Sequence, residues 1–236
     1  MKKKYKLLKK DTIEVIPADG NKIFRKLYRI RAMQDFGDVK KGDLGGYVES
    51  EDNLSQFNTC WIDEKSKIYG NAYVNLDAKV IHSTIFDTAF VSGNAIVEDS
   101  TIYGNAKISS YSKIKKSRIY GNADIFENAE VINSFVFGST IICGDAYITS
   151  TRDWASAESF GSRDGSTTFF RCKDGKIRVT CGCFFGTIKE FKKRVKERHS
   201  DNKFGKEYLK LIELMEIRFS KPDERKDDIL WKRVMI

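Results

Sequence analysis

A stretch of small, hydroxyl-bearing and basic residues between Gly161 and Arg171 is the main candidate for binding chemistry in this chain. Glycine and serine leave backbone N–H groups accessible, hydroxyls donate hydrogen bonds, and arginine guanidinium groups match phosphate or carboxylate in shape and charge. We therefore expect this stretch to bind an anion. The alternative is a loop that enters a strand and whose arginines are only solvated. The expected ligand-binding residues are Arg163, Asp164, Thr167, Thr168 and Arg171.

Two histidines are the candidates for a general base, which needs a pKa near neutrality and contact with the acceptor. His82 occupies a repeating position that Asp99, Lys116 and Asn133 fill elsewhere, and such a column is typical of solvent-facing residues. His199 closes a basic segment that we expect to be helical, where a positive charge interacts favourably with the helix C-terminus. We therefore predict no catalytic residue.

The cysteines are candidates for zinc, since Cys172, Cys181 and Cys183 lie near one another in sequence and His199 follows. The Cys-x-Cys spacing is shorter than the gap between paired ligands in structural zinc sites. We expect buried or half-buried thiols, with no metal and no cofactor. Five cysteines without a framework spacing favour reduced thiols in a cytoplasm and no disulfide bonds.

The element that must position these residues has a period of seventeen residues. Each period holds three aliphatic positions spaced six, six and five residues apart, each with a small residue two positions before it. Gly-Asn pairs fall between them, where a corner needs unusual backbone conformations. The pattern predicts a β-helix with three faces and one tighter corner before each repeating serine. These serines are Ser66, Ser83, Ser100, Ser117 and Ser134.

These repeats resemble the hexapeptide-repeat family, over residues 54–150. The resemblance implies a left-handed parallel β-helix that associates as a homotrimer. The triangular coil here is one residue shorter than the eighteen-residue coil usual in that family. Many left-handed β-helix proteins transfer acetyl groups with a histidine base.

An aromatic residue follows one aliphatic position in every coil, so the aromatic side chains should form a column along one edge. We favour stacking within the fold or a trimer contact as its role. The alternative is a platform for the bases of a nucleotide or single strand. The column comprises Tyr69, Phe86, Tyr103, Tyr120 and Phe137.

The flanks differ from the repeats in composition. Residues 1–53 are predicted to form a β cap over the open end of the solenoid, with strands on either side of a turn at 17–21. Residues 151–236 are predicted to form an α+β module of two strands and two helices. The strands span 167–172 and 176–181, the helices begin after Thr187 and near Lys203, and the apolar residues after Ile229 suggest that the tail docks.

The net charge is +9, and the basic residues are concentrated near both ends of the chain. This distribution is compatible with an anionic partner and with a basic surface that is only solvated. Nucleic acid is possible but not favoured. The sequence has no apolar run long enough to span a bilayer and no secretion signal. We expect a protein of the bacterial host cytoplasm without membrane contact.

Nearly the whole chain resembles hexapeptide-repeat proteins encoded by phages and prophages, through the leader from Tyr28 to Glu49, the Ile-Tyr-Gly-Asn-Ala coils and the segment from Gly161 to Phe184. This setting implies a non-catalytic trimer that sequesters an anionic, nucleotide-like signal of host defence. Arg29 and Arg31 would join its pocket if subunits associate. The alternatives are a hexapeptide-repeat transferase with an acyl or nucleotide-activated donor, and a structural or protein-binding solenoid.

Overall fold

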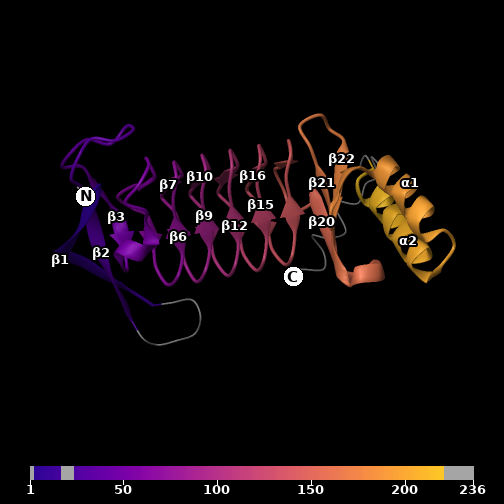
Figure 1. The fold of residues 1–236 in the computed structure, drawn as a ribbon, viewed down its shortest axis with the longest axis horizontal. Coiled ribbons are helices and arrows are strands. Elements are labelled where there is room, and N and C mark those ends of the chain that lie inside the picture. Colours follow the sequence, from indigo (N-terminus) through magenta and orange to yellow (C-terminus); the bar gives the residue numbers. More distant parts are fainter. Residues whose placement is uncertain (1–2, 17–23, 221–236) are drawn as a thin grey trace, which may run out of the picture.

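The computed structural model describes residues 3–16 and 24–220 as an elongated prism with a β cap at one end and a small sheet with two helices at the other (Figure 1). The protein is mainly β, and its centre is a three-faced solenoid of parallel strands. The predicted fold class, a parallel β-helix with a small C-terminal helical module, is confirmed.

Each coil of the solenoid contributes one short strand to each of three sheets, in parallel register. One face contains β5 (Lys67–Ile68), β8 (Thr84–Ile85), β11 (Thr101–Ile102), β14 (Arg118–Ile119) and β17 (Phe135–Val136). A second contains β6 (Tyr73–Val74), β9 (Phe90–Val91), β12 (Lys107–Ile108), β15 (Asp124–Ile125) and β18 (Ile141–Ile142). The third contains β4 (Trp61–Ile62), β7 (Lys79–Ile81), β10 (Ile96–Glu98), β13 (Lys113–Lys115), β16 (Glu130–Ile132) and β19 (Tyr147–Ile148).

The core is built from the predicted aliphatic positions. Ile102 and its equivalents in neighbouring coils, Ile85 and Ile119, have no exposed surface. Buried alanines such as Ala106 lie between the aliphatic side chains. Each coil buries its apolar residues only by stacking on its neighbours, so the solenoid is one continuous core.

The repeating serine explains how a coil closes in seventeen residues. The single residue before it, such as Asp99, takes a left-handed φ of 48° and makes the tight corner that was predicted. The serine N–H that follows donates to the Oγ of the serine one coil earlier, at 3.0 Å from Ser117 to Ser100. The Ser100 Oγ in turn donates to the Glu98 carbonyl at 2.6 Å. The serine hydroxyl therefore replaces a main-chain acceptor that the shortened corner lacks.

Replacing Ser100 with alanine should destabilise the solenoid by about 1–3 kcal/mol, because the buried Ser117 N–H would lose its acceptor, whereas the Glu98 carbonyl would keep the hydrogen bond from the Lys116 N–H. Urea unfolding followed by circular dichroism measures this loss. Ser109→Ala, in the same coil, removes a hydroxyl that makes no hydrogen bond to the described residues and should change stability by less than about 0.5 kcal/mol. Equal effects of the two substitutions would contradict this explanation of the corner.

The N-terminal strands extend one solenoid face. β1 (Tyr5–Val15) and β2 (Arg25–Ala32) pair antiparallel, β2 pairs antiparallel with β3 (Leu44–Val48), and β3 pairs parallel with β5. A 3₁₀ helix, η1 (Glu51–Asn53), leads into the first coil. Tyr5 and Ile30 are fully buried in the solenoid core, so these strands cover its end. The predicted turn at 17–21 lies outside the described residues.

The C-terminal module contains four antiparallel strands, not the two that were predicted. They are β20 (Trp154–Phe160), β21 (Gly165–Arg171), β22 (Ile177–Cys181) and β23 (Phe184–Thr187), with the 3₁₀ helix η2 (Gly161–Arg163) between the first two. The first strand was missed because its alanines, serines and glutamate show little apolar alternation. The last was missed because it is short and contains a glycine.

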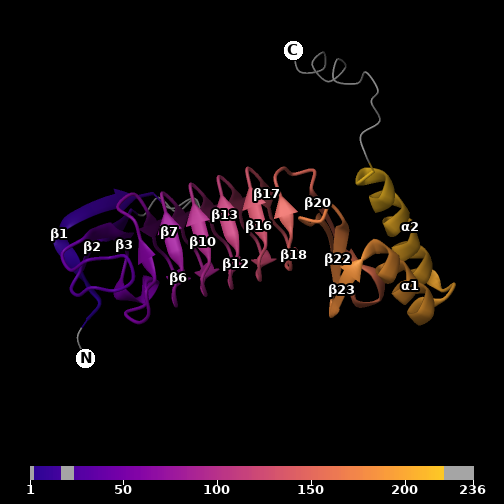
Figure 2. The ribbon, with the colours of Figure 1, turned by 90° about the horizontal axis from the view of Figure 1, so that it is seen from above.

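This sheet lies between the solenoid and the two helices, as both views show (Figures 1 and 2). Phe170 packs into the solenoid core, while Phe169 on the other face packs against α1 (Ile188–His199) and α2 (Lys203–Arg218). The predicted capping box of Thr187 and Glu190 begins α1, and α2 buries Tyr208, Leu211, Ile212 and Met215 as predicted. The predicted docking of the tail concerns residues 221–236, which lie outside the described residues.

Candidate functional site: the terminal pocket

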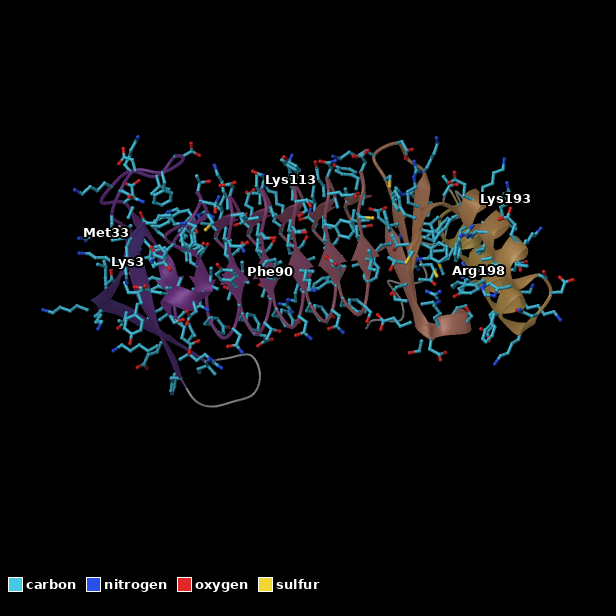
Figure 3. All side chains as sticks on the ribbon, viewed as in Figure 1. Lys3, Met33, Phe90, Lys113, Lys193 and Arg198 are labelled. Carbon is cyan, nitrogen blue, oxygen red and sulfur yellow. The ribbon has the colours of Figure 1, made fainter. Side chains whose placement is uncertain are left out.

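A large cavity lies where the last coil, the C-terminal sheet and the two helices meet. Its volume is about 880 Å³, within the ~300–1,000 Å³ range of small-molecule sites. We name it the terminal pocket. Its walls come from the last coil at Ser139 and Ile141, residues 162–163 and 165–166, residues 181–185 between β22 and β23, one side of α1, and Tyr208 of α2. Figure 3 shows Lys193 and Arg198 on α1, two of the charged residues along this wall.

The pocket carries an excess of positive charge. Arg163, Arg194 and Arg198 line it, and none of them forms an ion pair with another described residue. The carboxylates in its wall are Glu190, which accepts a hydrogen bond from the Thr187 N–H at 2.7 Å, and Glu197, which pairs with Lys193 at 3.8 Å. The three arginines and Lys193 outnumber these two carboxylates, so an anion entering the pocket would meet a net positive charge among the described lining residues.

The rest of the lining is apolar with a few neutral hydrogen-bonding groups. The ring of Phe185 is half exposed, while Phe191 and Tyr208 are buried. Burial raises the pKa of Tyr208 to about 12, so its hydroxyl is neutral at physiological pH. The Oγ of Ser166 is buried and has no hydrogen-bond partner among the residues that the structure describes. These groups suit a ligand that has both a charged and an apolar part.

The predicted anion-binding residues do not form one site. Arg163 lines the pocket, and Asp164 next to it has a left-handed φ of 46°. Thr167 and Thr168 are buried in β21, where Thr167 Oγ1 donates to Cys181 Sγ at 3.2 Å and Thr168 Oγ1 accepts from the Ile141 N–H at 3.3 Å. The Thr167 hydroxyl thus links two strands of the sheet, and the Thr168 hydroxyl links the sheet to the last coil. Neither threonine lines the terminal pocket.

Arg171 has a structural contact as well. Its Nε lies 3.3 Å from Asp153 Oδ1, and its guanidinium group lies 6.0 Å from the centre of the Phe219 ring. Asp153 Oδ2 accepts from the N–H groups of Thr149 and Ser150 at 2.9 and 3.1 Å. Arg171 therefore joins the C-terminal sheet to the end of the last coil and is absent from the pocket lining.

Asp153 should make the junction sensitive to acid. Burial raises the pKa of this carboxyl, but the hydrogen bonds from Thr149, Ser150 and Arg171 outweigh burial and hold the pKa below its ordinary value of 3.8. A lowered pKa stabilises the folded state above the ordinary value, and this contribution is lost as pH falls through the lowered value.

Replacing Asp153 with asparagine should therefore cost about 1–3 kcal/mol of unfolding free energy at pH 7 and markedly less near pH 3. Denaturant unfolding at the two pH values measures the difference. Asp201→Asn, at an exposed carboxylate for which no ion pair or hydrogen bond is found among the described residues, is the control and should cost little at either pH. A loss that does not depend on pH would contradict the ionised junction.

Arg29 and Arg31 lie at the opposite end of the solenoid from the pocket, so the prediction that they complete it is not supported within one chain (Figure 1). The Arg29 guanidinium group pairs with Asp11 at 3.1 Å and lies 4.5 Å from the centre of the Tyr47 ring. Arg31 is exposed on β2. Both belong to the surface of the N-terminal cap.

The two histidines are in different settings. His82 is partly exposed at a tight corner, with Nε2 3.0 Å from Asp63 Oδ2 and Nδ1 3.4 Å from Asp99 Oδ1. Both of its nitrogens face carboxylates, and at least three coils, ~14 Å, separate it from the terminal pocket. His199 lines the pocket, with its ring 5.6 Å from that of Tyr208. Of the two, only His199 can reach a ligand there.

All five cysteines are free thiols. Burial raises the pKa of Cys172 to about 11, and Cys181 and Cys183 line the terminal pocket. Among the residues that the structure describes, no three His, Cys, Asp or Glu side chains are grouped as a metal would require.

The predicted aromatic column forms, with successive ring centres 5.0–5.3 Å apart. Its first two rings, Tyr69 and Phe86, are covered by Leu27 of the N-terminal hairpin, with Ile13 and Val15 beside it. Stacking hides the ring faces from solvent, which leaves mainly ring edges for any partner. The column thus acts within the fold, and its role as a trimer contact remains a prediction.

Arg194 and Arg198 were not predicted as site residues. Their spacing of four residues on a helix places them on one side of α1, which is a signal present in the sequence. The sequence does not show, however, that this side of α1 lies over the edge of the C-terminal sheet.

No known protein-family model matches this chain. Over 84 residues it is 30% identical to an uncharacterized acetyltransferase, YdcK, of Escherichia coli strain K12. The match covers 35% of this chain and 26% of that protein, so it spans about a quarter of the length of the relative. Together with the β-solenoid, this similarity fits a hexapeptide-repeat β-helix family. In the described part of the chain, no helix is long and apolar enough to cross a membrane.

Proposed function

We propose that this protein is a hexapeptide-repeat transferase of the acyl class that holds an anionic donor in the terminal pocket. The observation that carries the proposal is the pocket itself, in which three arginines without ion-pair partners among the described residues line a cavity of about 880 Å³ with apolar walls. The similarity to an acetyltransferase favours transfer of an acyl group over other uses of such a pocket.

In this proposal the arginines bind the anionic part of an acyl thioester, and the apolar walls keep water from its carbonyl group. A hydroxyl or amine of the acceptor attacks the carbonyl carbon, a new C–O or C–N bond forms, and the C–S bond breaks. His199 takes the acceptor's proton and returns it to the leaving thiolate. The Tyr208 hydroxyl, which burial keeps neutral, lies at the same wall, where Cys181 Sγ is 3.8 Å away.

A second candidate is sequestration, in which a trimer of phage origin binds a nucleotide-like signal of host defence and leaves it intact in the bacterial cytoplasm. It is favoured because a transferase would have a single histidine, His199, at the pocket to act as base. His82 lies at least three coils away, and both of its nitrogens face carboxylates. Trimer contacts would form at the less covered end of the aromatic column, where Phe137 is 44% exposed.

The test is incubation with acetyl-coenzyme A and a panel of small amines and alcohols, with the donor and its products separated by chromatography. We expect consumption of the donor, a decrease of about a hundredfold or more for His199→Gln, and no change for His82→Gln. A donor that binds and is recovered intact would favour sequestration. A donor that neither binds nor reacts would contradict the proposal.

A further inference from the structure

We infer that the terminal pocket recognises a nucleoside phosphate with at least two negative charges, its phosphates against Arg163, Arg194 and Arg198 and its base against Phe184 and Phe185. This inference rests on the proposed function, since it names the class of ligand that the same site takes. It makes the nucleotide, and not the acyl group, the recognised part of the ligand.

The number of charges follows from the arginines. Three arginines without ion-pair partners among the described residues line one cavity, from the two elements η2 and α1. Their side chains are exposed, so a ligand with two or more negative charges can pair with more than one of them as it enters. Guanidinium groups bind phosphate oxygens in pairs, so a diphosphate or several phosphate groups matches them best.

The hydroxyl groups of the same wall suit oxygen-rich ligands. Ser166 Oγ is buried and has no hydrogen-bond partner in the described part of the chain, although buried polar atoms are nearly always hydrogen-bonded. It lies one residue from Gly165, at which an added Cβ would have no atom within 4 Å, so the wall is open beside it. A phosphate or ribose oxygen at this point would give the Ser166 hydroxyl its missing partner.

The aromatic residues provide a flat apolar surface next to the charges. Phe184 is held by Phe191, with ring centres 5.1 Å apart. Phe185 is 51% exposed, and its ring lies against the Gly144 corner of the last coil, 3.0 Å from where a Cβ of that residue would be. One ring is thus fixed by packing and the other offers accessible surface. Since every base has a flat aromatic face, stacking here would select a nucleotide without fixing which base it carries.

Calorimetric titration of the full chain with adenosine, AMP, ADP and inorganic pyrophosphate tests the inference. ADP should bind about tenfold more tightly than AMP, and at least tenfold more tightly than adenosine or pyrophosphate. Arg194→Gln should weaken ADP about tenfold and leave adenosine unchanged, while Phe185→Ala should weaken ADP and leave pyrophosphate unchanged. Arg31→Gln removes the same charge at the far end of the solenoid and should change nothing.

The outcomes separate this inference from the proposed function when acetyl-coenzyme A is titrated alongside. Pyrophosphate binding as tightly as ADP would overturn the role of the base, and adenosine binding as tightly as ADP would overturn the role of the phosphates. If neither ADP nor AMP binds but the acyl donor is consumed, the inference fails and the proposed function stands. If acetyl-coenzyme A also neither binds nor reacts, both fail.

Discussion

Replacing Gly161 with alanine should abolish ligand binding at the terminal pocket while the solenoid remains folded. The added Cβ would lie 2.0 Å from the Tyr208 hydroxyl oxygen and 2.1 Å from the ring carbon that carries it. Tyr208 is buried between Phe160 and Phe191, so the ring can escape only if α2 moves away from η2. Because both elements form walls of the pocket, we expect no measurable affinity of this variant for an anionic ligand.

The control for this substitution is Gly175→Ala. Gly161 and Gly175 have nearly equal left-handed φ values of 73° and 75°, so alanine strains the backbone equally at both. At Gly175, however, no atom lies within 4 Å of the added Cβ. Calorimetry with an anionic nucleotide should show binding by the Gly175 variant and none by the Gly161 variant. Equal affinities would mean that the contact between Tyr208 and η2 does not shape the pocket.

The largest loss of global stability is expected for Gly46→Ala. Gly46 lies in β3, which pairs with the first coil through the Tyr47 N–H and the Ser66 carbonyl at 3.0 Å. An added Cβ would be 2.3 Å from that carbonyl oxygen and 2.6 Å from the carbonyl oxygen of Asp63. These are backbone atoms that cannot rotate away, so β3 must separate from β5. We expect a loss of about 3 kcal/mol or more and a partly exposed solenoid end.

Gly165→Ala is the matched change, because its φ is not left-handed and an added Cβ meets no atom within 4 Å. Urea unfolding should place this variant within about 0.5 kcal/mol of the parent protein. Of the two variants, only Gly46→Ala should form more soluble aggregates than the parent protein, since an uncovered coil presents unpaired strand edges. A Gly46 variant as stable as the parent would contradict the tight approach of the cap to the first coil.

The solenoid was predictable from sequence because each of its requirements has its own residue type at a fixed spacing. Aliphatic residues fill the interior, Gly70 and its equivalents at 104, 121 and 138 turn one corner with φ of 68–73°, and the repeating serines close the shortened corner. Five copies of one pattern make the reading secure, since chance matches do not recur at a constant period.

The terminal pocket was predictable only in part, because its residues come from segments far apart in the chain. Arg163 was found from its small and polar neighbours. Arg171 has similar neighbours, yet it pairs with Asp153, a contact that depends on how the sheet meets the last coil. Arg194 was missed because sequence does not show which side of α1 faces the sheet edge. Local composition therefore pointed to one residue of the pocket lining, Arg163, and not to the residues that α1 adds.

Native mass spectrometry of the protein purified from bacterial cells, followed by denaturation and analysis of released molecules, tests most directly whether the terminal pocket binds an anionic ligand. We expect the protein to carry, or to take up from a mixture of acetyl-coenzyme A and nucleotides, a phosphate-containing molecule that the Gly161→Ala variant does not bind. A folded parent protein that stays empty in that mixture, or a Gly161→Ala variant that retains the same molecule, would contradict it.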